Sequence, residues 1–185
     1  DEARPVVTGV FLHTTGGVLF VAATDSYRLA EKGLMKTSQD ISLLVPADAM
    51  QELLRILPDT VDTVTVIADA QQVLFRAGDI ELVTRLIDAT YPDYKKLIPN
   101  SFSTSATLPR DELISITKVS SLFARESAGS ITLRVDDVDG VVSIDSIASQ
   151  LGENSSKASA TIEGSGSVTL NSRYLLDALN AIGSK

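Results

Sequence analysis

The sequence predicts an α+β protein built from repeated strand–helix–strand–strand–strand units, with the helices packed on antiparallel sheets. At three places a short apolar run leads into a helical apolar stripe. The transitions fall at Pro46, Pro109 and Asn171, which are 63 and 62 residues apart. Runs with strand-like alternation and turn residues between them follow the first two helices. A fixed spacing of this size is typical of a duplicated supersecondary unit.

Three runs before the first transition are predicted to be strands: Val6–His13, Val18–Ala23 and Arg28–Leu34. Each is short, rich in apolar residues and bounded by turn residues. No helical pattern precedes them. We therefore interpret them as the last three strands of an earlier copy of the unit, and expect the chain to begin in mid-repeat.

The first complete unit starts with the apolar run at Ser42 and becomes helical at Pro46. Proline is tolerated at a helix start because the N–H it lacks would be unpaired there anyway. The helix is expected to face a sheet with one apolar stripe at i, i+3, i+4 and i+7, formed by Met50, Leu53, Leu54 and Leu57. Three strands should follow it, at Val61–Ile67, Val73–Ala77 and Glu81–Ile87.

The second unit starts at Ala106 and becomes helical at Pro109. Its helical stripe is less regular and consists of Leu113, Ile116, Val119 and Phe123. The strands predicted after it are Ser130–Val135, Val141–Ile147 and roughly Ala158–Glu163. The polar segment Gly152–Ser156 is predicted to be a turn before the last of them.

The third unit starts at Val168, and Asn171 is predicted to cap its helix by accepting a backbone N–H. The helical stripe comprises Leu175, Ala178, Leu179 and Ile182. The sequence stops after this helix, so we expect the chain to end in mid-repeat as well. Between the two halves, the segment Tyr91–Ser101 contains two prolines and little periodicity, which is typical of a domain crossing.

Composition excludes several classes of function. The 185 residues include 16 basic and 24 acidic side chains, for a net charge of -8. Such an acidic chain is poorly suited to binding phosphates through bulk charge. Without cysteine it cannot have a disulfide scaffold, a thiolate zinc site or a cysteine nucleophile. No apolar run reaches the roughly 18 residues of a membrane span, and no signal peptide is predicted.

Few residues suggest chemistry. The one histidine, His13, is expected to be a lone surface or half-buried side chain that faces away from the neighbours of Phe11. The acidic segment Asp136–Gly140 lacks the distal glutamate of a calcium loop, so we interpret it as a solvated hairpin turn. No metal site and no cofactor are predicted.

The turn between the second and third predicted strands is different. Tyr27 and Leu29 place bulky apolar surface beside Arg28, while Asp25 is expected to pair with Arg28 and hold the turn. Tyrosine and arginine are favoured as anchors in protein interfaces, so this turn could form a binding rim. Two alternatives remain open. One is an α+β enzyme with a site at Asp25, Arg28 and Tyr27, and the other is a stand-alone protein-interaction module.

Four motifs, in order, carry a specific resemblance to a known family. They are Arg4-Pro5-Val6-Val7-Thr8-Gly9-Val10, Ala23-Thr24-Asp25-Ser26-Tyr27-Arg28-Leu29-Ala30, Leu86-Ile87-Asp88-Ala89-Thr90-Tyr91-Pro92-Asp93-Tyr94 and Leu170-Asn171-Ser172-Arg173-Tyr174-Leu175-Leu176-Asp177-Ala178-Leu179. Together they span almost the whole sequence. They resemble segments of the bacterial sliding clamp family, the β subunit of DNA polymerase III.

The resemblance implies the DNA-clamp fold, in which each of three similar domains contains two β-α-β-β-β halves. Residues 1–99 would be most of a central domain without its opening strand and helix. Residues 100–105 would be a linker, and residues 106–185 part of the third domain without its final strands. The family forms head-to-tail dimeric rings that close between the first domain of one subunit and the third domain of the next. A chain without the first domain is therefore expected to be monomeric.

The function implied by the resemblance is mechanical rather than catalytic. The intact ring encloses duplex DNA and tethers the replicative polymerase, which makes synthesis processive. The chain would thus be a non-catalytic part of the DNA polymerase III holoenzyme in the bacterial cytoplasm. Its partners would be duplex DNA, the polymerase, the clamp loader and other proteins that carry a short clamp-binding motif.

The resemblance also implies two sets of site residues. Partner motifs would enter a groove between the central and third domains, lined by Val7, Thr24, Ser26, Tyr27, Arg28, Leu29, Pro92, Lys96, Leu97, Asn171 and Tyr174. The basic residues on or beside helices that could face DNA are Arg55, Arg110, Lys118, Arg125 and Arg173. Ala47 and Asp48 stand where the family often has basic residues, which argues against DNA contact by the first helix.

Overall fold

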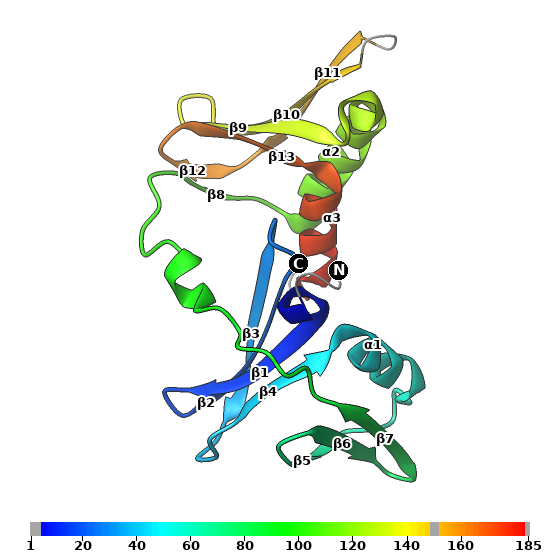
Figure 1. The fold of residues 1–185 in the computed structure, drawn as a ribbon. Helices are drawn as coiled ribbons and strands as arrows, with labels where there is room; N and C mark the ends of the chain where they lie inside the picture. The colour runs from blue at the N-terminus through cyan, green and yellow to red at the C-terminus, as the bar shows by residue number, and fades with distance from the viewer. Residues whose placement is uncertain (1–4, 149–151, 184–185) are drawn as a thin grey trace. The chain divides into compact units, whose positions relative to one another are not determined.

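The computed structural model describes residues 5–148 and 152–183, so Arg4 of the first motif lies outside the described residues. The chain divides into two compact units, which meet in the sequence between Lys95 and Lys96. Figure 1 shows both as helices packed on antiparallel sheets. Each unit is described by itself. No helix in the described ranges has the length and apolar character needed to cross a membrane.

The first unit opens with a 3-10 turn, η1 (Pro5–Thr8), and a four-stranded sheet. The strands are β1 (Gly9–Thr15), β2 (Val18–Thr24), β3 (Leu29–Lys36) and β4 (Ser42–Pro46), and their order is β3-β2-β1-β4. All the pairings are antiparallel. Gly16 and Gly17 both have positive φ, as a tight two-residue hairpin between β1 and β2 requires.

The helix α1 (Ala47–Ile56) follows β4 and leads to a three-stranded sheet of β5 (Thr65–Ala68), β6 (Gln72–Ala77) and β7 (Ile80–Arg85). Leu53 packs in a core with residues of both sheets, namely Leu12, Val45, Val73 and Phe75. Met50 and Leu57 border that core as expected, but Leu54 is 79% exposed. The buried line runs through positions 50, 53 and 57, and it leaves residue 54 on the flank of the helix.

Two strands of the first unit begin well after the predicted start, while the other boundaries agree to within two residues. The run at Val6–His13 is strand only from Gly9 onward, because Pro5 has no N–H to give to a ladder and starts the 3-10 turn instead. The run at Val61–Ile67 is strand only from Thr65. The amide of Val61 donates to the carbonyl of Pro58, so this residue belongs to a turn.

The second unit repeats the plan. After β8 (Ser105–Thr107) come α2 (Arg110–Phe123), the 3-10 turn η3 (Ala124–Ser127), β9 (Ser130–Asp136) and β10 (Val141–Ala148). They are followed by β11 (Gly152–Ser159), β12 (Thr161–Glu163), β13 (Gly166–Asn171) and α3 (Ser172–Ala181). The order β11-β10-β9-β13 matches β3-β2-β1-β4 element for element, which confirms the internal repeat.

The turn predicted at Gly152–Ser156 is wrong, because these residues form the first half of β11. They pair with β10 along its whole length, and this pairing holds a polar, Ser-rich segment in the extended form. The predicted strand Ala158–Glu163 is in fact split by Ala160. Its first two residues end β11, and its last three form β12, which pairs with β8.

The buried face of α2 also differs from the predicted stripe. Val119 is 43% exposed, whereas Thr117 and Ser120 are fully buried. The Thr117 hydroxyl donates to the Leu113 carbonyl, and that of Ser120 donates to the Ile144 carbonyl in β10. A small side chain lets the helix approach the strand closely. On α3, Leu179 is buried as predicted, but Ala178 and Ile182 are exposed.

Candidate functional site

The turn between β2 and β3 is held by a dense set of hydrogen bonds. One carboxylate oxygen of Asp25 accepts the backbone N–H groups of Tyr27 and Arg28, each at 3.0 Å. The other oxygen accepts the Arg28 guanidinium at 2.9 Å, so the predicted pairing of Asp25 with Arg28 is confirmed. The Thr24 hydroxyl donates to the Arg28 carbonyl at 2.7 Å. These bonds thus tie the backbone and side chains of the turn to one another.

The charge of Asp25 follows from these contacts. Partial desolvation by itself would raise the pKa of this carboxyl. The two backbone N–H donors and the Arg28 guanidinium outweigh that effect and lower the pKa overall. The side chain is therefore an ionised brace at neutral pH.

The same geometry presents a projecting aromatic ring. Ser26 has φ +75°, a left-handed conformation that is uncommon for residues other than glycine. Tyr27, the next residue, is 81% exposed. At the end of the turn, Leu29 is only half-buried and packs against a core cluster formed by Ala22, Leu44, Tyr91 and Tyr94. An exposed ring and an apolar side chain therefore flank Arg28.

The segment after β7 lies against the first sheet through aromatic rings. Tyr91 stacks on Phe11 with ring centroids 4.6 Å apart, and Phe11 stacks on His13 at 4.7 Å. Tyr94, the first residue of the 3-10 turn η2 (Tyr94–Leu97), is 2% exposed and meets both His13 and Tyr91 edge-on. This stack fixes the chain just before Lys95.

His13 does not behave as the sequence predicts. It is only 8% exposed, and its ring stacks on Phe11 instead of facing away from that residue's neighbours. Residues 11 and 13 of a strand share one face of the sheet, so the predicted orientation is wrong. The imidazole Nε2 lies 2.7 Å from the Tyr94 hydroxyl oxygen, and Nδ1 lies 3.1 Å from the Thr15 hydroxyl oxygen.

The proton positions in this cluster follow from its partners. The Tyr94 hydroxyl donates its one proton to the Glu31 carboxylate, so its oxygen accepts from Nε2–H of His13. The Nδ1 atom then accepts from the Thr15 hydroxyl. Burial, together with the nearby Lys95 ammonium, lowers the pKa of His13 despite the opposing charge of Glu31. Burial and the bond to Glu31 raise the pKa of Tyr94.

In the second unit, Asn171 caps α3 as predicted. Its side-chain oxygen accepts the Arg173 backbone N–H at 2.9 Å, and its amide donates to the Ala128 carbonyl at 3.0 Å. Ala128 and Gly129 have positive φ, and a Cβ added at Gly129 would lie 3.1 Å from the Asn171 amide nitrogen. Asn171 thus joins the start of α3 to the turn after η3. The Tyr174 side chain, one helical turn on, is half-buried.

The predicted basic residues fall into two groups. Arg55 forms a bidentate pair with Glu52, and the Arg110 guanidinium donates to the Ile182 carbonyl at the end of α3. These two cations therefore serve local contacts. Lys118, Arg125 and Arg173 are exposed in the second unit.

The predicted groove residues are divided between the units. The first unit holds Val7, Thr24, Ser26, Tyr27, Arg28, Leu29 and Pro92, and the second holds Lys96, Leu97, Asn171 and Tyr174. Among them, Leu97 is 74% exposed. Sequence reasoning missed the supporting cluster of His13, Glu31, Tyr91 and Tyr94. The one signal available was the pair of tyrosines three residues apart in a segment interpreted as a crossing.

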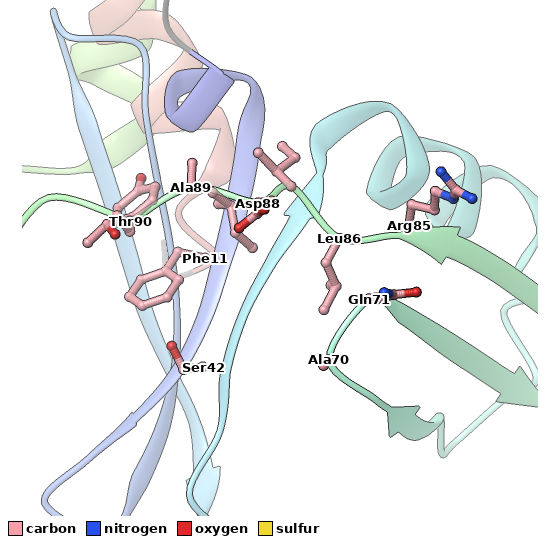
Figure 2. A pocket seen from close by; sticks show the side chains of 12 residues that line it. Phe11, Ser42, Ala70, Gln71, Arg85, Leu86, Asp88, Ala89 and Thr90 are labelled. Carbon is pink, nitrogen blue, oxygen red and sulfur yellow. The ribbon is translucent and has the colours of Figure 1, made fainter.

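A cavity of about 940 Å³ lies within the first unit beside the stacked rings of Phe11 and Tyr91 (Figure 2). Phe11 and Ser42 contribute from the first sheet, and Ala70 and Gln71 contribute from the β5–β6 turn. The segment Arg85–Tyr91 completes the lining. In the described part of the chain, no group of three or more metal-ligating side chains is found.

Comparison with known structures defines the class of protein. The structure is similar to a DNA polymerase sliding clamp from Bacillus subtilis, with a TM-score of 0.92 and 29% identity over 100% of this chain and 50% of that one. It is also similar to the DNA polymerase III beta chain of Streptococcus pneumoniae, with a TM-score of 0.89 and 31% identity over 100% and 50% of the two chains.

Family models place the chain more specifically. The model of the DNA polymerase III beta subunit central domain matches residues 1–93, and that of its C-terminal domain matches residues 95–185. The chain belongs to the DNA polymerase III beta subunit family, so the family and the fold class predicted from the sequence are confirmed.

A curated relative, the beta sliding clamp of Staphylococcus aureus, is 31% identical over 186 residues. The match covers 98% of this chain and 49% of the relative. The chain therefore spans about half the length of the curated relatives it matches.

Proposed function

We propose that this chain acts as part of a DNA sliding clamp, the processivity factor that tethers the replicative polymerase and other partners to duplex DNA in an intact ring. The observation that supports this most strongly is the match of two successive clamp-domain models along the chain, in order. In this role residues 1–99 are central domain, residues 100–105 a linker and residues 106–185 third domain. The chain has no catalytic role and works in the cytoplasm.

The proposed interaction site is the partner groove. Leu29 and Leu97 supply apolar wall together with Val7 and Pro92, while Arg28 offers charged donors to a peptide. The Asn171 oxygen caps α3 and its amide donates to the Ala128 carbonyl, so Asn171 would shape the site by holding the helix start against the turn after η3. Of the proposed DNA-facing residues, Arg55 and Arg110 already form local bonds, and Lys118, Arg125 and Arg173 are exposed in the second unit.

The enzyme alternative has little support. Both carboxylate oxygens of Asp25 are occupied by donors within the turn, so this group is not poised to move a proton. The alternative of a stand-alone interaction module assumes the same peptide groove. It differs from the clamp proposal only in that the chain would not be part of a ring.

Peptide binding tests the groove. A synthetic peptide with a glutamine followed by leucine and phenylalanine, the clamp-binding pattern, should bind and shift the amide resonances of Thr24–Leu29. Tyr27→Ala should weaken that binding about tenfold, because an aromatic anchor at an interface typically contributes more than about 1 kcal/mol. Tyr27 is 81% exposed, so its removal should leave the fold intact.

The matched control is Val138→Ala, which trims a side chain that is 89% exposed at the β9–β10 turn. This variant should bind the peptide as the parent does. A peptide that shifted other resonances, or that bound Tyr27→Ala as tightly as the parent, would contradict the groove assignment.

A further inference from the structure

Two of the segments that contribute residues to the proposed groove are far apart in the sequence. One is the β2–β3 turn, which ends at Leu29. The other is η2, which starts at Tyr94 and ends at Leu97. A hydrogen-bond relay joins them. Thr15, His13, Tyr94 and Glu31 follow one another in it, and the Lys95 ammonium lies 3.7 Å from the same Glu31 oxygen.

The relay connects three elements. His13 and Thr15 belong to β1, and Glu31 belongs to β3, two residues after Leu29. The Tyr94 hydroxyl bridges them from η2, across 81 residues of sequence to His13 and 63 to Glu31. Lys95 also lies over the Phe20 ring of β2, with Nζ 4.1 Å from the ring centroid. The start of η2 is therefore attached to three adjacent strands.

Burial and hydrogen bonding both strengthen the attachment of η2 at Tyr94. Tyr94 is 2% exposed, and its hydroxyl uses both its donor and an acceptor position. A hydrogen bond to a charged partner is stronger than a neutral one, and a buried polar group that loses its partner is costly. Leu29 packs against the same cluster that contains Tyr94. The end of the β2–β3 turn and the start of η2 therefore share one support.

We infer that His13, Glu31 and Tyr94 are positioning residues for partner binding, which hold the start of η2 against β3 and so set where Leu97 can meet a peptide. Leu97 follows Tyr94 by three residues, which is one turn of a 3-10 helix. Holding Tyr94 therefore restricts Leu97. The inference rests on the proposed function, and it makes His13 matter to binding although it lies outside the groove.

Tyr94→Phe tests the relay while keeping the buried ring. The variant should bind the glutamine-leucine-phenylalanine peptide about tenfold more weakly, because it removes the hydroxyl that bridges His13 and Glu31. Its Leu97 amide should exchange hydrogen faster than in the parent, while the core amide of Val73 should exchange at nearly the parent rate. Glu31→Gln, which retains a weaker acceptor, should show the same two changes to a smaller extent.

The control for the change of charge is Glu81→Gln, since Glu81 forms an exposed pair with Arg76 in the β6–β7 hairpin. It should alter neither peptide affinity nor exchange at Leu97. If the parent binds the peptide and Tyr94→Phe binds equally well with unchanged Leu97 exchange, the positioning role is overturned and the groove remains. A parent that bound no peptide would overturn the groove proposal itself, and the positioning role with it.

Discussion

At the scale of single residues, many hydrogen bonds in the β2–β3 turn hold Ser26 in an unfavourable backbone conformation. Ser26 takes φ +75°, and its amide donates to the Thr24 hydroxyl at 3.1 Å. The left-handed region costs a non-glycine residue roughly 1–2 kcal/mol. The hydrogen bonds to Asp25 hold the turn in place against that cost.

Ser26→Gly should therefore stabilise the protein. We expect a gain of about 0.5–1 kcal/mol in the free energy of unfolding, because relief of the left-handed conformation exceeds the extra entropy of glycine in the unfolded chain. Urea denaturation measures it. Ser26→Val is the opposing variant, since a β-branched residue is strained at this φ, and it should be destabilised. A Ser26→Gly protein less stable than the parent would contradict the assignment of strain.

His13 gives a second residue-scale prediction. Its pKa is lowered in the folded protein, so the unfolded state binds the proton more readily. Stability should then fall as the pH falls below the unfolded pKa of about 6.5, until the folded pKa is reached. His13 is the only histidine, and the carboxyl groups with lowered pKa titrate further down. Most of the slope in urea midpoints between pH 5 and 7 should therefore come from this residue.

His13→Gln is the test of that slope, because glutamine can still donate a hydrogen bond but does not titrate. Its urea midpoint should stay nearly level over the same range of pH. An equal slope in the two proteins would show that another group is responsible.

At the scale of elements, α2 packs on its sheet through Leu113 and Ile116, while its two fully buried positions, Thr117 and Ser120, are small and polar. Ser120 donates to the Ile144 carbonyl and accepts from the Asn154 amide of β11 at 3.1 Å, so one hydroxyl joins the helix to two strands. The Thr117 hydroxyl is bonded to the turn before it. Thr117 and Ser120, the two fully buried polar side chains of α2, therefore both have hydrogen-bond partners.

Ser120→Leu should destabilise the protein by about 2–3 kcal/mol, since a larger side chain has no room between α2 and β10 and the hydrogen bonds are lost as well. Val119→Leu is the matched control, because it enlarges the neighbouring side chain, which is 43% exposed. That change should alter the free energy of unfolding by less than about 0.5 kcal/mol. Equal effects of the two substitutions in urea unfolding would mean that the helix faces have been assigned wrongly.

At the scale of the whole molecule, net charge bears on the DNA contact that we propose for this chain. The net charge is -8, and two of the five candidate basic residues are bonded locally. The other three candidates, Lys118, Arg125 and Arg173, are exposed in the second unit. If the chain acts in a sliding clamp as we propose, an acidic surface with a few basic side chains would give weak and mobile phosphate contacts.

We expect this chain to bind linear duplex DNA more weakly than ~10 μM at physiological salt, at or below the level of ordinary non-specific binding. Fluorescence anisotropy with a labelled duplex measures it. Raising the salt should lower the affinity only slightly, because few counterions are released. A sub-micromolar affinity independent of DNA sequence would contradict the prediction.

Local patterns in the sequence determined much of this protein. The spacing of Pro46, Pro109 and Asn171 predicted the repeat, and the motifs around Asp25 and Asn171 predicted the turn brace, the helix cap and the family. The brace and the cap depend on residues a few positions apart, and the repeat shows itself as a regular spacing along the chain, so a linear pattern is enough to reveal them. The assignment of the groove residues remains a prediction.

Tertiary structure alone decided the rest. The burial of His13, the inward face of Ser120 and the extended form of Gly152–Ser156 each depend on a segment far along the chain. Tyr94 meets His13 across 81 residues, Asn154 meets Ser120 across 34, and β11 is extended because β10 pairs with it. A periodic pattern of apolar residues predicts which apolar side chains are buried. Burial of a polar group depends instead on whether a partner reaches it, and only the folded chain brings those partners together.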